Sequence, residues 1–91
     1  MNKPAKHIIF KGRVQGVGFR FTVFRIATRH QLSGLVRNLP DGTVEMIAQG
    51  NADDITGCIQ DIEKSFEGYL RETTTREIPT DPQYSDFKIT F

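Results

Sequence analysis

The sequence predicts a single α+β domain with the element order β-α-β-β-α-β. Its 91 residues, of which 37% are hydrophobic, suffice for one sheet and two helices over a single core. Apolar residues recur with a period of two in the segments expected to be strands, and at spacings of three and four in those expected to be helices. Because no internal repeat, low-complexity tract or linker interrupts the pattern, residues 1–91 are predicted to form one domain.

The first two elements are predicted to be a strand over residues 5–14 and a helix over residues 21–32. In the strand, one face carries Ile8, Phe10 and Val14. The helix has a broad apolar side, with Val23, Phe24, Ile26 and Ala27. Ser33-Gly34 is expected to end this helix, since glycine is the usual residue after a helix C-terminus.

A hairpin is predicted next, with strands over residues 34–39 and 43–49. The sequence Pro-Asp-Gly at residues 40–42 favours a tight turn between them. On the first of these strands Val36 and Asn38 share the face that points toward the core. Asn38 is therefore a polar residue at the end of a core-facing row, where a buried amide needs hydrogen-bond partners or a function.

The second half of the chain predicts a helix over residues 51–66, a Thr-rich edge strand over residues 71–78 and a last strand over residues 86–91. The helix has an apolar stripe of Ile55, Ile59, Ile62 and Phe66. Beside the stripe, Cys58 is expected to be a small core residue and not a nucleophile. In the last strand the residues expected to point inward are Phe87, Ile89 and Phe91.

The loop between the first strand and the first helix is a candidate anion-binding site. Gly16 and Gly18 can adopt backbone angles that a Cβ would forbid, so several N–H groups can point at one ligand. The positive end of the helix dipole faces the same point, and Arg20 adds a two-pronged guanidinium group. Neither G-x-G-x-x-G nor the phosphate loop G-x-x-x-x-G-K-[ST] is present, which favours a smaller phosphorylated ligand over a nucleotide. The alternative is that this segment is only a tight turn.

Charge is distributed unevenly along the chain. Residues 1–40 contain no acidic residue and eight basic ones: Lys3, Lys6, Lys11, Arg13, Arg20, Arg25, Arg29 and Arg37. All eleven acidic residues follow from Asp41 onward. The glycine loop should therefore have a local positive potential that attracts anions. At longer range, a compact fold that mixes the two halves would cancel much of this field.

Composition also limits the location and the cofactors. No apolar run approaches the length of a membrane helix and no signal-peptide pattern is present, so we expect a cytoplasmic protein with no membrane partner. We also expect a monomer, although no feature of the sequence indicates the oligomeric state. The single cysteine fits a reducing compartment. His7, on the first strand, is expected to be a surface residue, and His30 a helix-dipole partner or solvent-exposed residue. No residue spacing typical of metal ligands occurs, and we expect neither a metal nor a cofactor.

Two motifs resemble those of the acylphosphatase family. Residues 12–20, GRVQGVGFR, match the family pattern G-x-V-Q-G-V-x-F-R, and residues 34–45, GLVRNLPDGTVE, match G-x-V-x-N-x-x-D-G-x-V. Together they cover about the first half of the chain, and the second half agrees in element order only. Similar proteins often carry a Gly-Pro-rich turn and a valine-rich strand after the second helix. Here Phe-Glu-Gly-Tyr at residues 66–69 and a Thr-rich stretch occur instead.

The resemblance implies a ferredoxin-like sandwich, with two helices on one face of an antiparallel sheet. It implies hydrolysis of the carboxyl–phosphate bond of a small-molecule acyl phosphate, giving a carboxylate and inorganic phosphate without a metal or cofactor. The phosphate-binding residues it implies are Gln15, Gly16, Val17, Gly18, Phe19 and Arg20. By the same resemblance Arg20 and Asn38 are catalytic, with Asn38 positioning the attacking water. A carboxylate leaves as an anion at pH 7, so this chemistry needs no general acid.

Three alternatives stay open beside the enzyme. An RNA-binding module of the same element order would present aromatic residues on the open sheet face, but the expected solvent-facing positions of the first and third strands are Ile9, Lys11, Arg13, Glu45 and Ile47. That pattern argues against nucleic acid as a partner. The second alternative is a non-catalytic phosphate- or anion-binding module of the acylphosphatase type, like those at the front of larger hydrogenase-maturation proteins. The third is a purely structural domain, which leaves the coincidence of both motifs unexplained.

Overall fold

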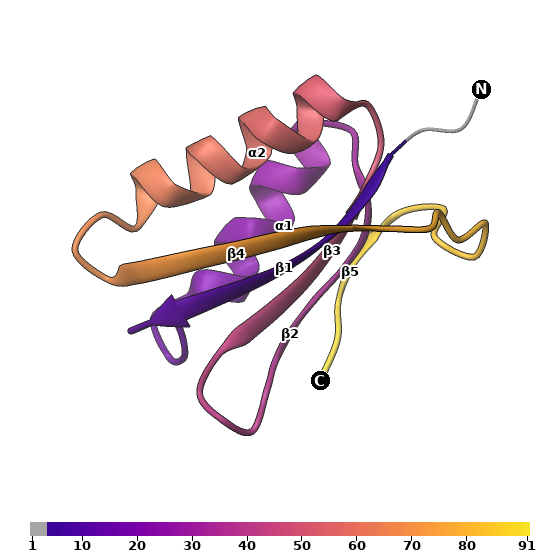
Figure 1. Ribbon diagram of the computed structural model, residues 1–91. Helices are drawn as coiled ribbons and strands as arrows, with labels where there is room; N and C mark the ends of the chain where they lie inside the picture. Colours follow the sequence, from indigo (N-terminus) through magenta and orange to yellow (C-terminus); the bar gives the residue numbers. More distant parts are fainter. Residues whose placement is uncertain (1–3) are drawn as a thin grey trace.

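The computed structural model describes residues 4–91, which form one five-stranded sheet covered on one face by two helices (Figure 1). The elements in chain order are β1 (Ala5–Gly12), α1 (Phe19–Arg29), β2 (Ser33–Asn38), β3 (Val44–Gln49), α2 (Ala52–Ser65), β4 (Leu70–Ile78) and β5 (Phe87–Ile89). This confirms the predicted order of the first six elements and the short strand after them. Neither helix among these residues is long and apolar enough to cross a membrane.

The sheet is mixed, so the prediction of an antiparallel sheet is wrong at one edge. Its strand order is β4-β1-β3-β2-β5, and all neighbours are antiparallel except β2 and β5. After β4, the chain crosses at the end of the sheet where β2 begins, and the N–H of Gly34 donates to the carbonyl of Asp86 there. Strand β5 therefore starts beside the start of β2 and runs parallel to it (Figure 1).

One end of the sheet collects three segments that are far apart in the sequence. Because β1, β2 and β5 run in the same direction, the β1–α1 loop, the β2–β3 turn and the residues after β5 all lie at the same end. Figure 1 shows the C-terminal residues running toward this end. The topology thus brings the glycine loop, Asn38 and the C-terminal residues together.

The core lies between the sheet and the two helices. The alternation predicted for the strands is confirmed, because Ile8, Phe10 and Val36 are fully buried while their strand neighbours are not. The third strand contributes Val44, Met46 and Ala48, and the helices contribute Val23, Ile26, Ala27, Ile55, Cys58 and Ile62. Burial of these side chains is the main favourable contribution to folding.

The end of the first helix differs from the prediction. Helix α1 ends at Arg29, and Ser33 and Gly34 already belong to β2. Gln31, with φ 60°, takes the left-handed position that usually favours glycine. The N–H groups of Gln31 and Leu32 bond back into the last helical turn, so the turn is closed without a glycine. The sequence did not indicate this because glutamine is not a typical residue for that conformation.

Phe91 was predicted to point inward, and this is wrong. Strand β5 ends at Ile89, and the side chain of Phe91 is 98% exposed. The ring lies against the guanidinium of Arg20, whose Cζ is 4.8 Å from the ring centroid. Phe87, the first residue of the strand, is buried as expected. The alternation therefore holds only as far as the ladder hydrogen bonds with β2 extend.

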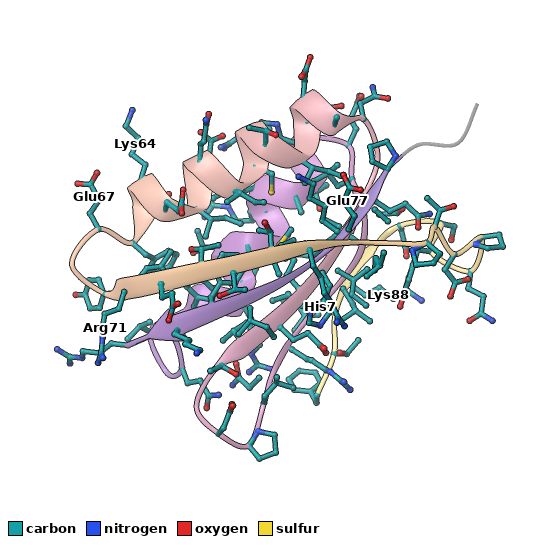
Figure 2. The ribbon with its side chains drawn as sticks, in the orientation of Figure 1. His7, Lys64, Glu67, Arg71, Glu77 and Lys88 are labelled. Carbon is teal, nitrogen blue, oxygen red and sulfur yellow. The ribbon has the colours of Figure 1, made fainter. Side chains whose placement is uncertain are left out.

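His7 is more than a solvated surface residue. It lies on the sheet face away from the helices (Figure 2), where its Nε2 is 2.7 Å from Oε2 of Glu45. The Nε of Arg37 donates to the other carboxylate oxygen at 2.6 Å. Burial alone would raise the pKa of Glu45, but the hydrogen bonds from His7 and Arg37 outweigh it and lower that pKa. His30 has a similar contact, with Nε2 2.8 Å from Oδ2 of Asp61.

Cys58 is fully buried in the core, as predicted, and this determines its reactivity. Burial, with a smaller contribution from the charge of Asp61, raises the pKa of the Cys58 thiol to about 12. The thiolate is the reactive form of cysteine, and little of it exists at pH 8 when the pKa is this high.

We therefore expect Cys58 to resist alkylation in the native protein. Incubation with iodoacetamide at pH 8, followed by mass spectrometry, should show essentially no adduct. The same treatment in guanidinium chloride should modify the thiol completely, which serves as the control. Rapid stoichiometric labelling of protein with an unchanged far-UV spectrum would contradict the burial of this side chain.

Candidate active site

The loop between β1 and α1 is shaped by two glycines in the left-handed conformation. Gly16 has φ 77° and Gly18 has φ 75°. A Cβ at either position would meet nothing within 4 Å, so the backbone angle, and not crowding, is what favours glycine. Gly18 is the N-cap residue of α1 and offers no side-chain hydrogen bond. The N–H groups of the first helical turn therefore have no side-chain cap and are available to an anion.

The start of α1 is held in place by an aromatic cluster. Phe19, the first helical residue, is 1% exposed, and its ring centroid lies 5.1 Å from that of Phe10 and 4.7 Å from that of Phe66. These contacts join β1, α1 and the end of α2 directly beneath the loop. Since Arg20 follows Phe19 in the helix, burial of the Phe19 ring leaves the Arg20 side chain outside the core.

Gln15 connects the loop to the hairpin between β2 and β3. Its side-chain Nε2 donates to the carbonyl oxygens of Leu39 and Thr43, at 2.9 Å each. Both acceptors lie in the turn that follows Asn38. This contact links two segments more than 20 residues apart, and no local sequence pattern indicates it.

The hairpin turn is itself closed by hydrogen bonds. Oδ1 of Asp41 accepts from the N–H of Thr43 at 3.0 Å and from its hydroxyl at 2.6 Å. These two bonds lower the pKa of Asp41. The N–H of Leu39 also donates to the carbonyl of Thr43. The end of β2, which carries Asn38, is thus held by both the turn and the loop.

A pocket of about 220 Å³ opens where these segments meet. Five of the residues that the sequence singled out line it: Gly16, Gly18, Phe19, Arg20 and Asn38. The remaining lining residues are apolar, namely Val14, Phe21, Ile89 and Phe91. Gln15 and Val17 were also expected at the phosphate site and are not among the lining residues. The side chain of Gln15 is engaged with the hairpin, and that of Val17 is 39% exposed.

Asn38 has a polar atom without a partner. Its Oδ1 is buried and accepts no hydrogen bond from any of residues 4–91. A buried acceptor left unpaired costs about 1–3 kcal/mol. Such an atom in the wall of a pocket is therefore suited to accept a hydrogen from a bound molecule.

Arg20 is also short of partners. Within the described part of the chain it forms no ion pair with Asp or Glu, whereas Arg29 pairs with Asp61, and Arg37 with Glu45. Its Nη1 makes only a long contact of 3.4 Å with the carbonyl of Thr90. The positive charge at the pocket is consequently not neutralised by the fold. Lys3, one of the eight basic residues of the first half, lies outside the described residues.

These features define the class of protein. An α+β sandwich with a glycine loop at a helix N-terminus, an unpaired arginine and an unsatisfied amide in one pocket is built to hold an oxyanion beside a positioned polar group. The family model described as acylphosphatase matches residues 6–89, so the chain belongs to the acylphosphatase family. The members of this family are hydrolases that cleave acyl phosphates.

Individual relatives agree with this assignment. The chain is 43% identical over 93 residues to an acylphosphatase of Chlorobaculum tepidum, and the match covers 98% of both chains. It superposes on the crystal structure of an acylphosphatase from Bacillus subtilis with a TM-score of 0.89 at 29% identity, covering 97% of this chain and 99% of that one. A likeness to T. kodakarensis HypF, with a TM-score of 0.85 at 36% identity, covers 97% of this chain but 12% of that chain. The enzyme is therefore favoured over the non-catalytic module.

The described residues contain no group of three or more His, Cys, Asp or Glu side chains that could hold a metal ion. None of the histidine, aspartate or glutamate side chains in residues 4–91 lines the pocket. Its polar side chains are the guanidinium of Arg20 and the amide of Asn38.

The role of Gln15 as a tether can be tested with Gln15→Leu. Loss of two hydrogen bonds to backbone carbonyls should reduce the free energy of unfolding by about 1–2 kcal/mol. Because the loop would then move relative to Asn38, kcat/KM for an acyl phosphate should fall by about 10-fold or more. Urea denaturation and steady-state kinetics measure the two effects.

Gln49→Leu is the matched control for this substitution. Gln49 also makes two hydrogen bonds to backbone atoms, both to Asp81, but at the opposite end of the sheet. We expect it to lose stability and keep kcat/KM. If both variants lost activity equally, or neither did, Gln15 would not be a specific tether of the site.

Proposed function

We propose that Arg20 and the loop hold the phosphoryl group of an acyl phosphate while Asn38 positions the attacking water. The observation that carries this proposal is the shared pocket, in which an unpaired guanidinium and an unsatisfied amide oxygen face the same space. In this proposal the phosphate-binding residues are 15–20, with Gln15 contributing only its backbone N–H because its side chain is engaged elsewhere.

The phosphoryl group would bind through charge and directed hydrogen bonds. The guanidinium of Arg20 can donate to two phosphoryl oxygens at once, which matches their geometry. Free N–H groups at the start of α1 and in the glycine loop supply further donors, and the helix dipole adds a favourable field. Phosphoryl transfer is catalysed mainly by positioning the reactants and by stabilising the negative charge on the phosphoryl oxygens. Arg20 and the N–H groups would provide this charge stabilisation.

Asn38 would act on the nucleophile. Its Oδ1 can accept a hydrogen from one water molecule, which aligns an oxygen lone pair of that water with the phosphorus atom. Water then forms a new P–O bond as the bond to the acyl oxygen breaks. The electron pair leaves with the carboxylate, which is stable at pH 7 because its acid has a pKa of about 4 to 5.

The substrate itself would accept the proton that the attacking water loses. Because no histidine, aspartate or glutamate side chain of residues 4–91 lines the pocket, the proton of the attacking water passes to an oxygen of the substrate's own phosphoryl group. The products are a carboxylate and inorganic phosphate. We further propose that the protein is a monomer. We also propose that it works in the cytoplasm, which the single free cysteine supports.

Substitution separates the proposed roles of the two polar residues. Arg20→Ala should damage both KM and kcat, and Arg20→Lys should recover little, since an ammonium group restores charge but not the two-pronged geometry. Asn38→Ala should lower kcat by about 10²–10³-fold with little change in KM, as expected for a contact made only in the transition state. Release of phosphate from benzoyl phosphate, with a simple phosphate ester as the negative substrate, measures these effects.

Two substitutions outside the pocket provide controls. Arg29→Ala removes a cation from the same helix, and Asn51→Ala removes an amide that caps α2 without a side-chain hydrogen bond. Both should retain normal kinetics. A folded Asn38→Ala protein with near-normal kcat would show that Asn38 is only a structural amide, and the water-positioning role would be abandoned.

The proposal also makes the reaction independent of metal, because Arg20 and the loop supply the positive charge. Activity should be unchanged after dialysis against excess EDTA. Added Mg²⁺ should give no stimulation. Loss of activity in EDTA that Mg²⁺ restores would refute the mechanism as stated.

A further inference from the structure

The pocket has an apolar side that phosphate binding does not use. The large apolar residues with exposed side chains among residues 4–91 are Val17, Phe21, Tyr69 and Phe91. Phe21 is 57% exposed and Phe91 is 98% exposed, and both line the pocket that contains Arg20. Scattered exposed apolar residues are ordinary, but a group of them at the rim of one polar pocket indicates a ligand-binding surface.

Contacts with neighbouring residues position each of these two rings. Phe21 lies in the first turn of α1, and the Cζ of Arg25 is 5.9 Å from its ring centroid. Phe91 follows β5 and stacks against Arg20. The N–H of Thr90 donates to the carbonyl of Val36 at 2.9 Å, which holds the residues after β5 beside β2.

The connectivity of the substrate determines what these rings would contact. An acyl phosphate joins its acyl group to phosphorus through a single oxygen, so the acyl group must lie within a few bond lengths of the phosphoryl group. With the phosphoryl group at Arg20 and the glycine loop, the acyl group occupies the remaining space of the same pocket. Besides the loop residues, Arg20 and Asn38, the pocket is lined by Val14, Phe21, Ile89 and Phe91, whose side chains carry neither a charge nor a hydrogen-bonding group.

We propose that Phe21 and Phe91 form the binding surface for the acyl group, and that the enzyme prefers acyl phosphates with aromatic or longer aliphatic acyl groups over acetyl phosphate. The inference rests on the proposed function, because it requires the phosphoryl group at Arg20. A methyl group covers little of either ring, whereas a phenyl or butyl group can pack against both. One aromatic contact of this kind is expected to change binding by about 3- to 10-fold.

The test compares acetyl, butyryl and benzoyl phosphate in the wild-type protein and in Phe21→Ala. The quantity to follow is the ratio of kcat/KM for benzoyl phosphate to that for acetyl phosphate, because intrinsic differences in reactivity cancel when the ratio is compared between variants. Phe21→Ala should lower this ratio about 3- to 10-fold, and Phe21→Leu should lower it less. The ratio for butyryl phosphate should fall by an intermediate amount.

Phe91→Ala is a second, independent test of the same acyl-binding surface. It should lower the benzoyl-to-acetyl ratio to a similar degree, and it should also reduce turnover of both substrates because Arg20 loses the ring against which it lies. Because both side chains are exposed, neither substitution should impair folding, and the melting temperature checks this. The matched control is Tyr69→Ala, which removes another exposed aromatic ring that lies near an arginine, Arg13, but does not line the pocket.

The outcomes separate this inference from the proposed function. If Phe21→Ala and Phe91→Ala leave the ratio at the wild-type value, or if Tyr69→Ala changes it equally, the acyl-binding surface is refuted while the hydrolysis mechanism stands. If wild-type protein hydrolyses neither acetyl nor benzoyl phosphate, the proposed function fails and the inference fails with it.

Discussion

The candidate site depends on the packing of the Phe19 ring in the core. The ring packs between Phe10 of β1 and Phe66 at the end of α2, and so determines where α1 begins. Several features of the pocket are placed relative to that helix start. The free N–H groups belong to its first turn, Arg20 is the next residue, and Phe21 follows at the rim. A residue of the hydrophobic core thus positions the N–H groups and the guanidinium that would bind an anion.

The distribution of ion pairs explains how a nearly neutral protein keeps a positive pocket. Acidic residues from the second half of the chain pair with basic residues from the first half, as Glu72 does with Lys11 and Asp61 with Arg29. Folding therefore pairs part of the charge that is separated along the sequence. Arg20 forms no ion pair within residues 4–91 and lies against the ring of Phe91. An aromatic neighbour stabilises the guanidinium without neutralising it, so the charge stays available to a ligand.

Local patterns predicted most of the elements, and each error has a physical cause that those patterns do not contain. Alternation and helical spacing report which side chains face the core, because they depend on residues a few positions apart. The exposure of Phe91 depends instead on how far the hydrogen bonds between β5 and β2 extend. The end of α1 at Arg29 depends on the left-handed conformation of Gln31, which glutamine does not signal in a sequence. The partner of β5 is likewise not a local property. Its parallel pairing with β2 follows from the end of the sheet at which the preceding loop crosses.

The sequence by itself indicated the candidate phosphate-binding loop, Arg20 and Asn38, because two contiguous motifs contain them and because glycines at these positions allow backbone angles that other residues rarely adopt. It also indicated most of the residues that build the core. Only the tertiary structure decided that Gln15 joins the loop to the hairpin, that Oδ1 of Asn38 is buried without a partner, and that Phe91 reaches the pocket. These are contacts between segments distant in the chain. Their geometry arises from strand order and direction, which the spacing of residues along one segment does not encode.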